Sequence, residues 1–182
     1  MSDLSGPETG LSRQASVHKS HSESCINHTV FTRAHFAVAW KIFSDCNLWP
    51  GFLESHGSSV HWHGAPWNAG SRLYFDVVEP KPARIECLLT LCTPPQCVGW
   101  IIRESGHTVQ QCVLFEPYVG GGTKITTWIE LADKEFPDSF ARVRSLLTSL
   151  LQTWFSNFTA ECDHQARLAV SHRLADSRAI GE

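Results

Sequence analysis

Apolar and polar positions alternate along the middle of the chain, and turn residues interrupt the alternation at Pro94-Pro95, Ser105-Gly106 and Gly120–Gly122. A period of two broken by turn residues is typical of antiparallel strands joined in hairpins. Ahead of these stretches lies a short run of β-branched and aromatic side chains. We therefore predict strands at 27–33, 58–64, 71–79, 84–93, 96–104, 108–116 and 124–132.

Helical spacing of apolar residues flanks the strands. It predicts a short helix at 34–44, and Asp45 can cap a second short helix with Pro50 in its first turn. A third helix begins at Pro137-Asp138 and runs to about Cys162. At 1.5 Å per residue it would be about 38 Å long, enough to cross a sheet. Its apolar positions recur three and four residues apart: Phe140, Val143, Leu147, Leu150, Leu151, Trp154 and Phe158.

The hairpin turns also predict which residues oppose one another, because directly opposed residues share a face of the sheet. The expected pairs are Leu91–Val98, Leu89–Trp100, Cys87–Ile102, Cys92–Cys97, Ile102–Val109, Trp100–Gln111, Val98–Val113, Phe115–Ile125, Val113–Thr127, Gln111–Ile129, Val77–Ile85, Phe75–Cys87 and Leu73–Leu89. The pair Cys92–Cys97 falls on the outer face, with Trp128. The others build one continuous inner face: Leu73, Phe75, Val77, Ile85, Cys87, Leu89, Leu91, Val98, Trp100, Ile102, Val109, Gln111, Val113, Phe115, Ile125, Thr127 and Ile129.

An antiparallel sheet with one apolar face needs a cover, and the long last helix is the apolar element long enough to provide it. The predicted fold is therefore α+β: a curved antiparallel sheet of about seven strands, with two short helices after the first strand, wrapped on a long C-terminal helix. We expect residues 1–25 to form a disordered tail, 26–162 to form the domain, and 163–182 to extend the helix or form a flexible tail.

Five segments stand out along this order of elements: 39–45 leading to Trp49-Pro50, Gly70-Ser71-Arg72, Val98-Gly99-Trp100, Phe115-Glu116-Pro117 and 121–125. With these segments in this order, the chain resembles the helix-grip fold of the START-like (SRPBCC) superfamily, in its polyketide cyclase/dehydrase and lipid transport branch. The resemblance covers about residues 26–162, and the ordered set of segments carries it rather than any single motif. It implies a hydrophobic cavity between the sheet and the long helix, and no particular reaction.

The residues expected to bind a ligand follow from the inner face and this cavity. Gln111 and Thr127 are its polar members; either a ligand's carbonyl or hydroxyl, or a local hydrogen bond to backbone or water, would satisfy them. Trp49, Phe52 and Trp67 could form a lid at the cavity entrance or pack on its rim. The remaining lining residues, which could instead fill a solid core, are Trp62, Phe75, Leu89, Trp100, Val113, Leu147, Leu150 and Trp154.

The composition narrows the class of protein further. The 182 residues carry a formal net charge of -3, so the basic surplus of a nucleic-acid-binding protein is absent. The sequence shows neither an apolar run long enough to cross a membrane nor the start of a signal peptide. We therefore expect a cytoplasmic monomer or homodimer with neither a nucleic-acid partner nor stable membrane insertion.

Neither a metal nor a cofactor is predicted. The seven cysteines include no CxxC pair, and they should stay free thiols in a reducing compartment. Cys92 and Cys97 could form only a strained cross-strand disulfide. His61 and His63 share one face of a strand, and we expect that face to be exposed to water.

Three classes of function remain open. Binding of a small hydrophobic or aromatic molecule, lipid-like or polyketide-like, is favoured, because the predicted inner face has no Asp, Glu, His or Lys in its middle to move a proton. A cyclase or dehydratase, whose catalytic residues would be unknown, is the first alternative. A protein-interaction module similar to the activators of the Hsp90 ATPase is the second; an apolar surface around Trp128 together with a filled cavity would favour it.

Overall fold

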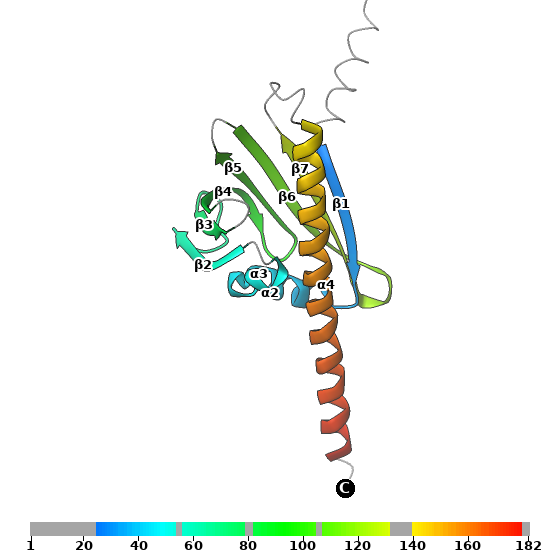
Figure 1. Cartoon of the computed structure of the whole chain (residues 1–182). Coiled ribbons are helices and arrows are strands. Elements are labelled where there is room, and N and C mark those ends of the chain that lie inside the picture. Colours follow the sequence, from blue (N-terminus) through cyan, green and yellow to red (C-terminus); the bar gives the residue numbers. More distant parts are fainter. Residues whose placement is uncertain (1–24, 54–55, 79–81, 105–106, 132–139, 180–182) are drawn as a thin grey trace, which may run out of the picture.

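The computed structural model describes residues 25–53, 56–78, 82–104, 107–131 and 140–179 (Figure 1). Residues 1–24 of the predicted N-terminal tail and the predicted start of the last helix at Pro137-Asp138 lie outside these residues. Cys25, predicted as the end of the tail, is instead the first residue of β1. The elements are β1 (Cys25–Thr32), α2 (Phe36–Ser44), the 3-10 helix η1 (Cys46–Leu48), α3 (Trp49–Phe52), β2 (His56–His63), β3 (Arg72–Val77), β4 (Ala83–Thr93), β5 (Cys97–Glu104), β6 (His107–Pro117), the 3-10 helix η2 (Val119–Gly121), β7 (Thr123–Leu131) and α4 (Phe140–Ala179).

The seven strands form one antiparallel sheet in the order β1-β7-β6-β5-β4-β3-β2. Helix α4 runs along its inner face, and α2 and α3 lie beside α4 near one end of the sheet (Figure 1). The predicted α+β helix-grip architecture is confirmed. Helix α4 is one continuous helix of 40 residues that passes the predicted end at Cys162, and its last turns project beyond the sheet and the short helices.

The turns after β1 explain how the short helices begin. The His35 imidazole accepts a hydrogen bond from the backbone N–H of Ala37 at the start of α2. The Asp45 carboxylate accepts one from the backbone N–H of Asn47 and so caps the 3-10 helix η1. The sequence predicts this cap for the helix that contains Pro50, which is wrong, because α3 begins after Leu48 without a side-chain cap. Pro50 lies in the first turn of α3, where its missing N–H costs no helical hydrogen bond.

Strand pairing agrees with the predicted register in the centre of the sheet. Trp100 opposes Gln111 across β5 and β6, and Val113 opposes Thr127 across β6 and β7. Between β3 and β4 the prediction is wrong by two residues, because Leu73 opposes Cys87 rather than Leu89. A shift of two residues leaves every side chain on its predicted face.

In the pairing of β4 with β5, the departure from the predicted register changes the face on which side chains lie. The register shifts between Leu89 and Leu91, so that Leu91 opposes Gly99 rather than Val98. A shift of one residue moves side chains to the other face. The prediction of Leu91 on the inner face is therefore wrong, and its side chain is 47% exposed.

The same shift overturns the expected pair of Cys92 and Cys97. Cys92 opposes Val98 and packs against the core. The thiol of Cys97 instead lies 3.4 Å from the thiol of Cys112 on the neighbouring strand β6. All seven cysteines are free thiols.

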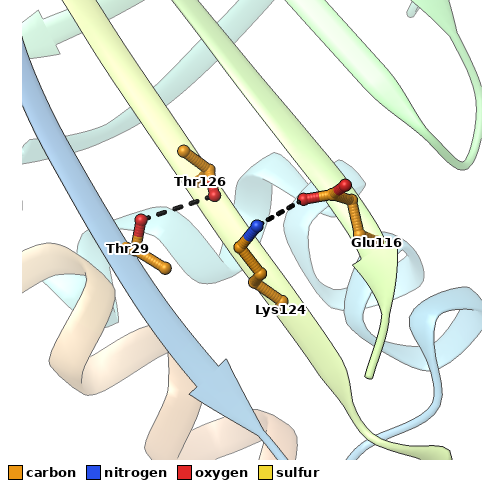
Figure 2. A network of polar contacts seen from close by, with 4 residues as sticks. All are labelled: Thr29, Glu116, Lys124 and Thr126. Atoms are coloured by element: carbon orange, nitrogen blue, oxygen red, sulfur yellow. Dashed lines mark hydrogen bonds and ion pairs between the residues drawn. The ribbon is translucent and has the colours of Figure 1, made fainter. Parts of the chain in front are cut away.

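The outer face of the sheet is stabilised by polar cross-strand pairs near β7 (Figure 2). The hydroxyls of Thr29 and Thr126 lie 3.4 Å apart across β1 and β7. The Lys124 ammonium lies 2.9 Å from a carboxylate oxygen of Glu116 across β6 and β7. Trp128 is on this face, as predicted, and is 37% exposed.

Helix α4 is fastened to the end of β1. The Asp163 carboxylate accepts hydrogen bonds from the Thr32 hydroxyl at 2.5 Å and from the Arg33 backbone N–H at 2.8 Å. The Thr32 hydroxyl also accepts from the backbone N–H of Ala34. These contacts fix the position of the helix across the inner face of the sheet.

Candidate functional site

A cavity of about 340 Å³ lies between the inner face of the sheet and the helices α3 and α4. Its wall combines side chains of five strands with the apolar side of α4, and α2 contributes a single residue. All but one of the lining side chains are apolar or sulfur-containing. The described lining residues are Phe43, Trp49, Leu53, Phe75, Val77, Ile85, Cys87, Trp100, Ile102, Val109, Gln111, Val113, Ile129, Leu147, Leu150, Leu151, Trp154 and Phe155.

Aromatic contacts hold the helical side of this wall in place. The ring of Phe43 lies 5.9 Å from that of Trp154 at a steep interplanar angle of 76°. The same ring lies 5.9 Å from Trp49 and 6.3 Å from Trp100. The Trp49 indole N–H donates to the Phe43 carbonyl at 2.8 Å. One phenyl ring thus connects α2, α3, α4 and the sheet.

Seven of the ten residues expected to bind a ligand line the cavity, and three do not. Trp62 packs on Trp67 instead, with ring centroids 5.1 Å apart. Leu89 is buried in the core. Thr127 is buried next to Gln111 without belonging to the described lining. The seven are Phe75, Trp100, Gln111, Val113, Leu147, Leu150 and Trp154.

Of the three residues expected at the entrance, only Trp49 belongs to the described lining. Phe52 packs edge to face on Trp154, 5.2 Å away. The Trp67 indole N–H donates to the Ser44 carbonyl at 3.0 Å, which anchors the β2–β3 connection to the end of α2. Phe52 and Trp67 therefore support the wall from behind.

Gln111 is the polar lining residue, and it takes part in a short chain of hydrogen bonds. Its Nε2 donates to the Thr127 hydroxyl at 3.2 Å. That hydroxyl donates to the Cys112 carbonyl at 3.0 Å. The chain runs from the cavity through β7 and back to the backbone of β6.

Sequence reasoning missed one histidine on the inner face. His28 of β1 lies opposite Thr127, and its ring centroid is 5.9 Å from that of Phe155. Its Nε2 is buried without a hydrogen-bond partner among the described residues, and desolvation lowers the pKa of the imidazole. The alternation in β1 could have identified His28 as an inward residue, because Ile26, His28 and Val30 alternate with exposed residues. The predicted inner face did not include this strand, since it started only at β3.

The alternation in the strands also could not predict which residues of the short helices line the cavity. Phe43 and Leu53 reach the cavity from α2 and from just after α3. Ten of the described lining residues were not among those expected to bind a ligand or to lie at the entrance. Most of the ten are inward strand positions. The distance between the sheet and α4 decides whether such a side chain borders the cavity or packs in the core.

The described lining offers little acid–base chemistry. Cys87 is its ionisable residue, and burial raises the pKa of this thiol to about 12. His61 and His63 are exposed to solvent, as predicted. Within the described part of the chain, three or more His, Cys, Asp or Glu side chains do not gather into a metal site, and none of the described helices is long and apolar enough to cross a membrane.

Comparison with known proteins places the fold. Neither a protein-family model nor a curated protein sequence matches the chain. Among solved structures, Ara h 8.0201 is similar with a TM-score of 0.64 and 14% identity, over 76% of this chain and 96% of that one. A START superfamily protein from Mycobacterium smegmatis gives 0.62 and 15%, over 78% and 98%.

Norcoclaurine synthase from Thalictrum flavum, in complex with dopamine and hydroxybenzaldehyde, gives a TM-score of 0.57 and 15% identity, over 94% of this chain and 98% of that one. These similarities reach almost the full length of each neighbour, although few residues are shared. The chain therefore has the helix-grip fold of START-like proteins.

Proposed function

We propose that this protein binds one small, largely apolar molecule, lipid-like or aromatic and polyketide-like, in the cavity between the sheet and α4. The observation that carries the proposal is the cavity itself, about 340 Å³ with an apolar wall. Well-packed protein interiors contain few voids larger than a water molecule. A space of this size falls within the range of small-molecule sites.

Apolar burial would supply the affinity. Removing about 200 Å² of apolar ligand surface from water contributes about 5 kcal/mol, before the cost of ordering the ligand. The neighbours support this kind of ligand, because the similar synthase structure holds dopamine and hydroxybenzaldehyde. Both of these are small aromatic molecules.

Two other functions have weaker support. A cyclase or dehydratase needs a proton acceptor beside its substrate, and the ionisable group of the described lining is a thiol whose pKa is raised to about 12. A protein-interaction module would fit the partly exposed Trp128. That alternative also requires that side chains fill the cavity, whereas the side chains leave a space of about 340 Å³.

Titration with the fluorescent probe N-phenyl-1-naphthylamine tests the proposal. Val109 lines the cavity, so Val109→Phe should weaken probe binding at least tenfold by occupying part of the space. Val170→Phe introduces the same ring at a position on α4 that is 58% exposed, and it should bind like the wild type. Circular dichroism confirms that both variants fold.

A wild-type protein that fails to bind the probe, and whose native mass spectrum shows no co-purified small molecule, would refute the proposed function. Equal binding by Val109→Phe and the wild type would refute the cavity as the site.

A further inference from the structure

We infer that Gln111 presents a hydrogen-bond acceptor to the cavity, so that the site selects an apolar ligand carrying a hydroxyl or N–H donor, such as a phenol or an alicyclic alcohol. This inference rests on the proposed function and specifies the ligand class of the same site. It concerns which end of one side-chain amide faces the ligand.

The direction of the hydrogen bonds fixes the amide. A carbonyl oxygen can only accept, so the 3.0 Å contact between the Thr127 hydroxyl and the Cys112 carbonyl uses the one hydrogen of that hydroxyl. Toward Gln111, at 3.2 Å, Thr127 can then only accept. The amide must therefore turn its NH₂ group to Thr127, since an oxygen in that place would face a second acceptor.

The other end of the amide remains for the ligand. Thr127 is 1% exposed and is not part of the described lining, whereas Gln111 is. With Nε2 directed to Thr127, Oε1 lies on the opposite branch of the planar amide carbon. Among the described residues, the Gln111 side chain hydrogen-bonds to Thr127 through Nε2, and this bond does not involve Oε1.

The other side chains of the described wall do not supply a comparable acceptor. The indole groups of Trp49, Trp100 and Trp154 can only donate. The Cys87 sulfur is a weak acceptor. A ligand hydroxyl or N–H that enters the cavity is therefore matched by Gln111, while an ether or carbonyl oxygen placed there would meet the lone pairs of Oε1.

A matched pair of ligands tests this difference. 1-Naphthol and 1-methoxynaphthalene have the same ring system, and only the first carries a donor. We expect wild-type protein to bind 1-naphthol at least tenfold more tightly than the ether. The two ligands also differ in hydration, which affects their dissociation constants in every variant equally. We therefore compare the ratio of the two dissociation constants in the wild type with the same ratio in each variant.

Three variants make the test specific. Gln111→Leu should reduce the preference for 1-naphthol at least tenfold. Thr127→Val removes the group that fixes the amide and leaves Gln111 in place; the amide can then turn its NH₂ to the ether, so the preference should fall mainly because the ether binds better. Thr127→Ser keeps the hydroxyl and should retain the preference.

The outcomes separate this inference from the proposed function. Tight binding of both ligands with a ratio unchanged in Gln111→Leu and Thr127→Val would refute the acceptor role and leave the binding cavity intact. If the wild type bound neither ligand nor N-phenyl-1-naphthylamine, both proposals would fail together. A Thr127→Ser variant that lost the preference would also count against the assigned amide orientation.

Discussion

Trp49 and Trp154 meet edge to face at the cavity wall, with ring centroids 6.0 Å apart and an interplanar angle of 87°. This contact joins the short helix α3 to the long helix α4, although about a hundred residues separate the two in sequence. A second link lies beside it, because the Asn157 side-chain amide donates to the Phe52 carbonyl at 3.0 Å. The closure of the cavity at this end therefore depends on the docking of a four-residue helix.

Replacing Trp154 should lower stability strongly. The indole is 9% exposed and contacts Trp49, Phe52 and Phe158. We expect Trp154→Ala to lower the free energy of unfolding by about 3–5 kcal/mol, measured by urea denaturation, because it leaves a void in the aromatic wall. The matched control is Trp128→Ala on the outer face, which should cost less than about 1 kcal/mol. A loss of less than about 1 kcal/mol for Trp154→Ala, no larger than that of the control, would show that the Trp154 contacts contribute little.

Stability should depend on pH through His28. Desolvation lowers the pKa of this imidazole below its ordinary value of 6.5. As the pH falls through 6.5, the unfolded chain takes up the proton before the folded protein does, so the free energy of unfolding decreases on acidification. His28→Phe should flatten this decrease between about pH 7 and pH 5.5, where carboxylates contribute least.

The control for this prediction is His61→Phe, because His61 is exposed on β2. Its pH dependence should follow that of the wild type in urea denaturation at each pH. An unchanged slope in His28→Phe would mean that the half-buried imidazole is protonated as easily in the folded protein as in the unfolded chain.

The thiol of Cys87 should be unreactive even though it borders the cavity. Burial raises its pKa to about 12, so very little thiolate is present near pH 8, and the thiolate is the nucleophile. We expect iodoacetamide to modify Cys87 in the folded protein at least a hundredfold more slowly than in urea, as followed by peptide mass spectrometry. Fast modification of the folded protein at Cys87 would instead indicate an activated thiol and revive an enzymatic function.

The sequence pattern predicted the faces of the central strands and failed where the pattern carries no information. Between Leu88 and Cys92 nearly every side chain is apolar or small, so a one-residue shift leaves the alternation almost unchanged and the bulge after Leu89 is invisible. A two-residue slip, as between β3 and β4, preserves the period altogether. By contrast, only two residues separate the end of β5 from the start of β6, which leaves one register that keeps Trp100 and Gln111 on the inner face.

The cavity was harder to predict residue by residue than the fold. Whether an inward side chain borders the space or the core depends on how far the helices stand from the sheet, and this distance is set by contacts such as Phe43 with Trp100. These contacts join residues far apart in sequence, so no local period reports them. The polar chain from Gln111 to Cys112 likewise appears only when the strands are paired.

The pairing of β1 with β7 has a consequence for the order of folding. Val30 lies opposite Ile125, and Thr32 is bonded to Asp163 of α4. Closing such long loops costs entropy before any contact compensates for it, so contacts of this kind form slowly. The hairpins of β3 to β7 can assemble earlier from neighbouring segments. The cavity gains its second wall only when α4 docks, so a chain that is still being synthesised has no site to offer a ligand.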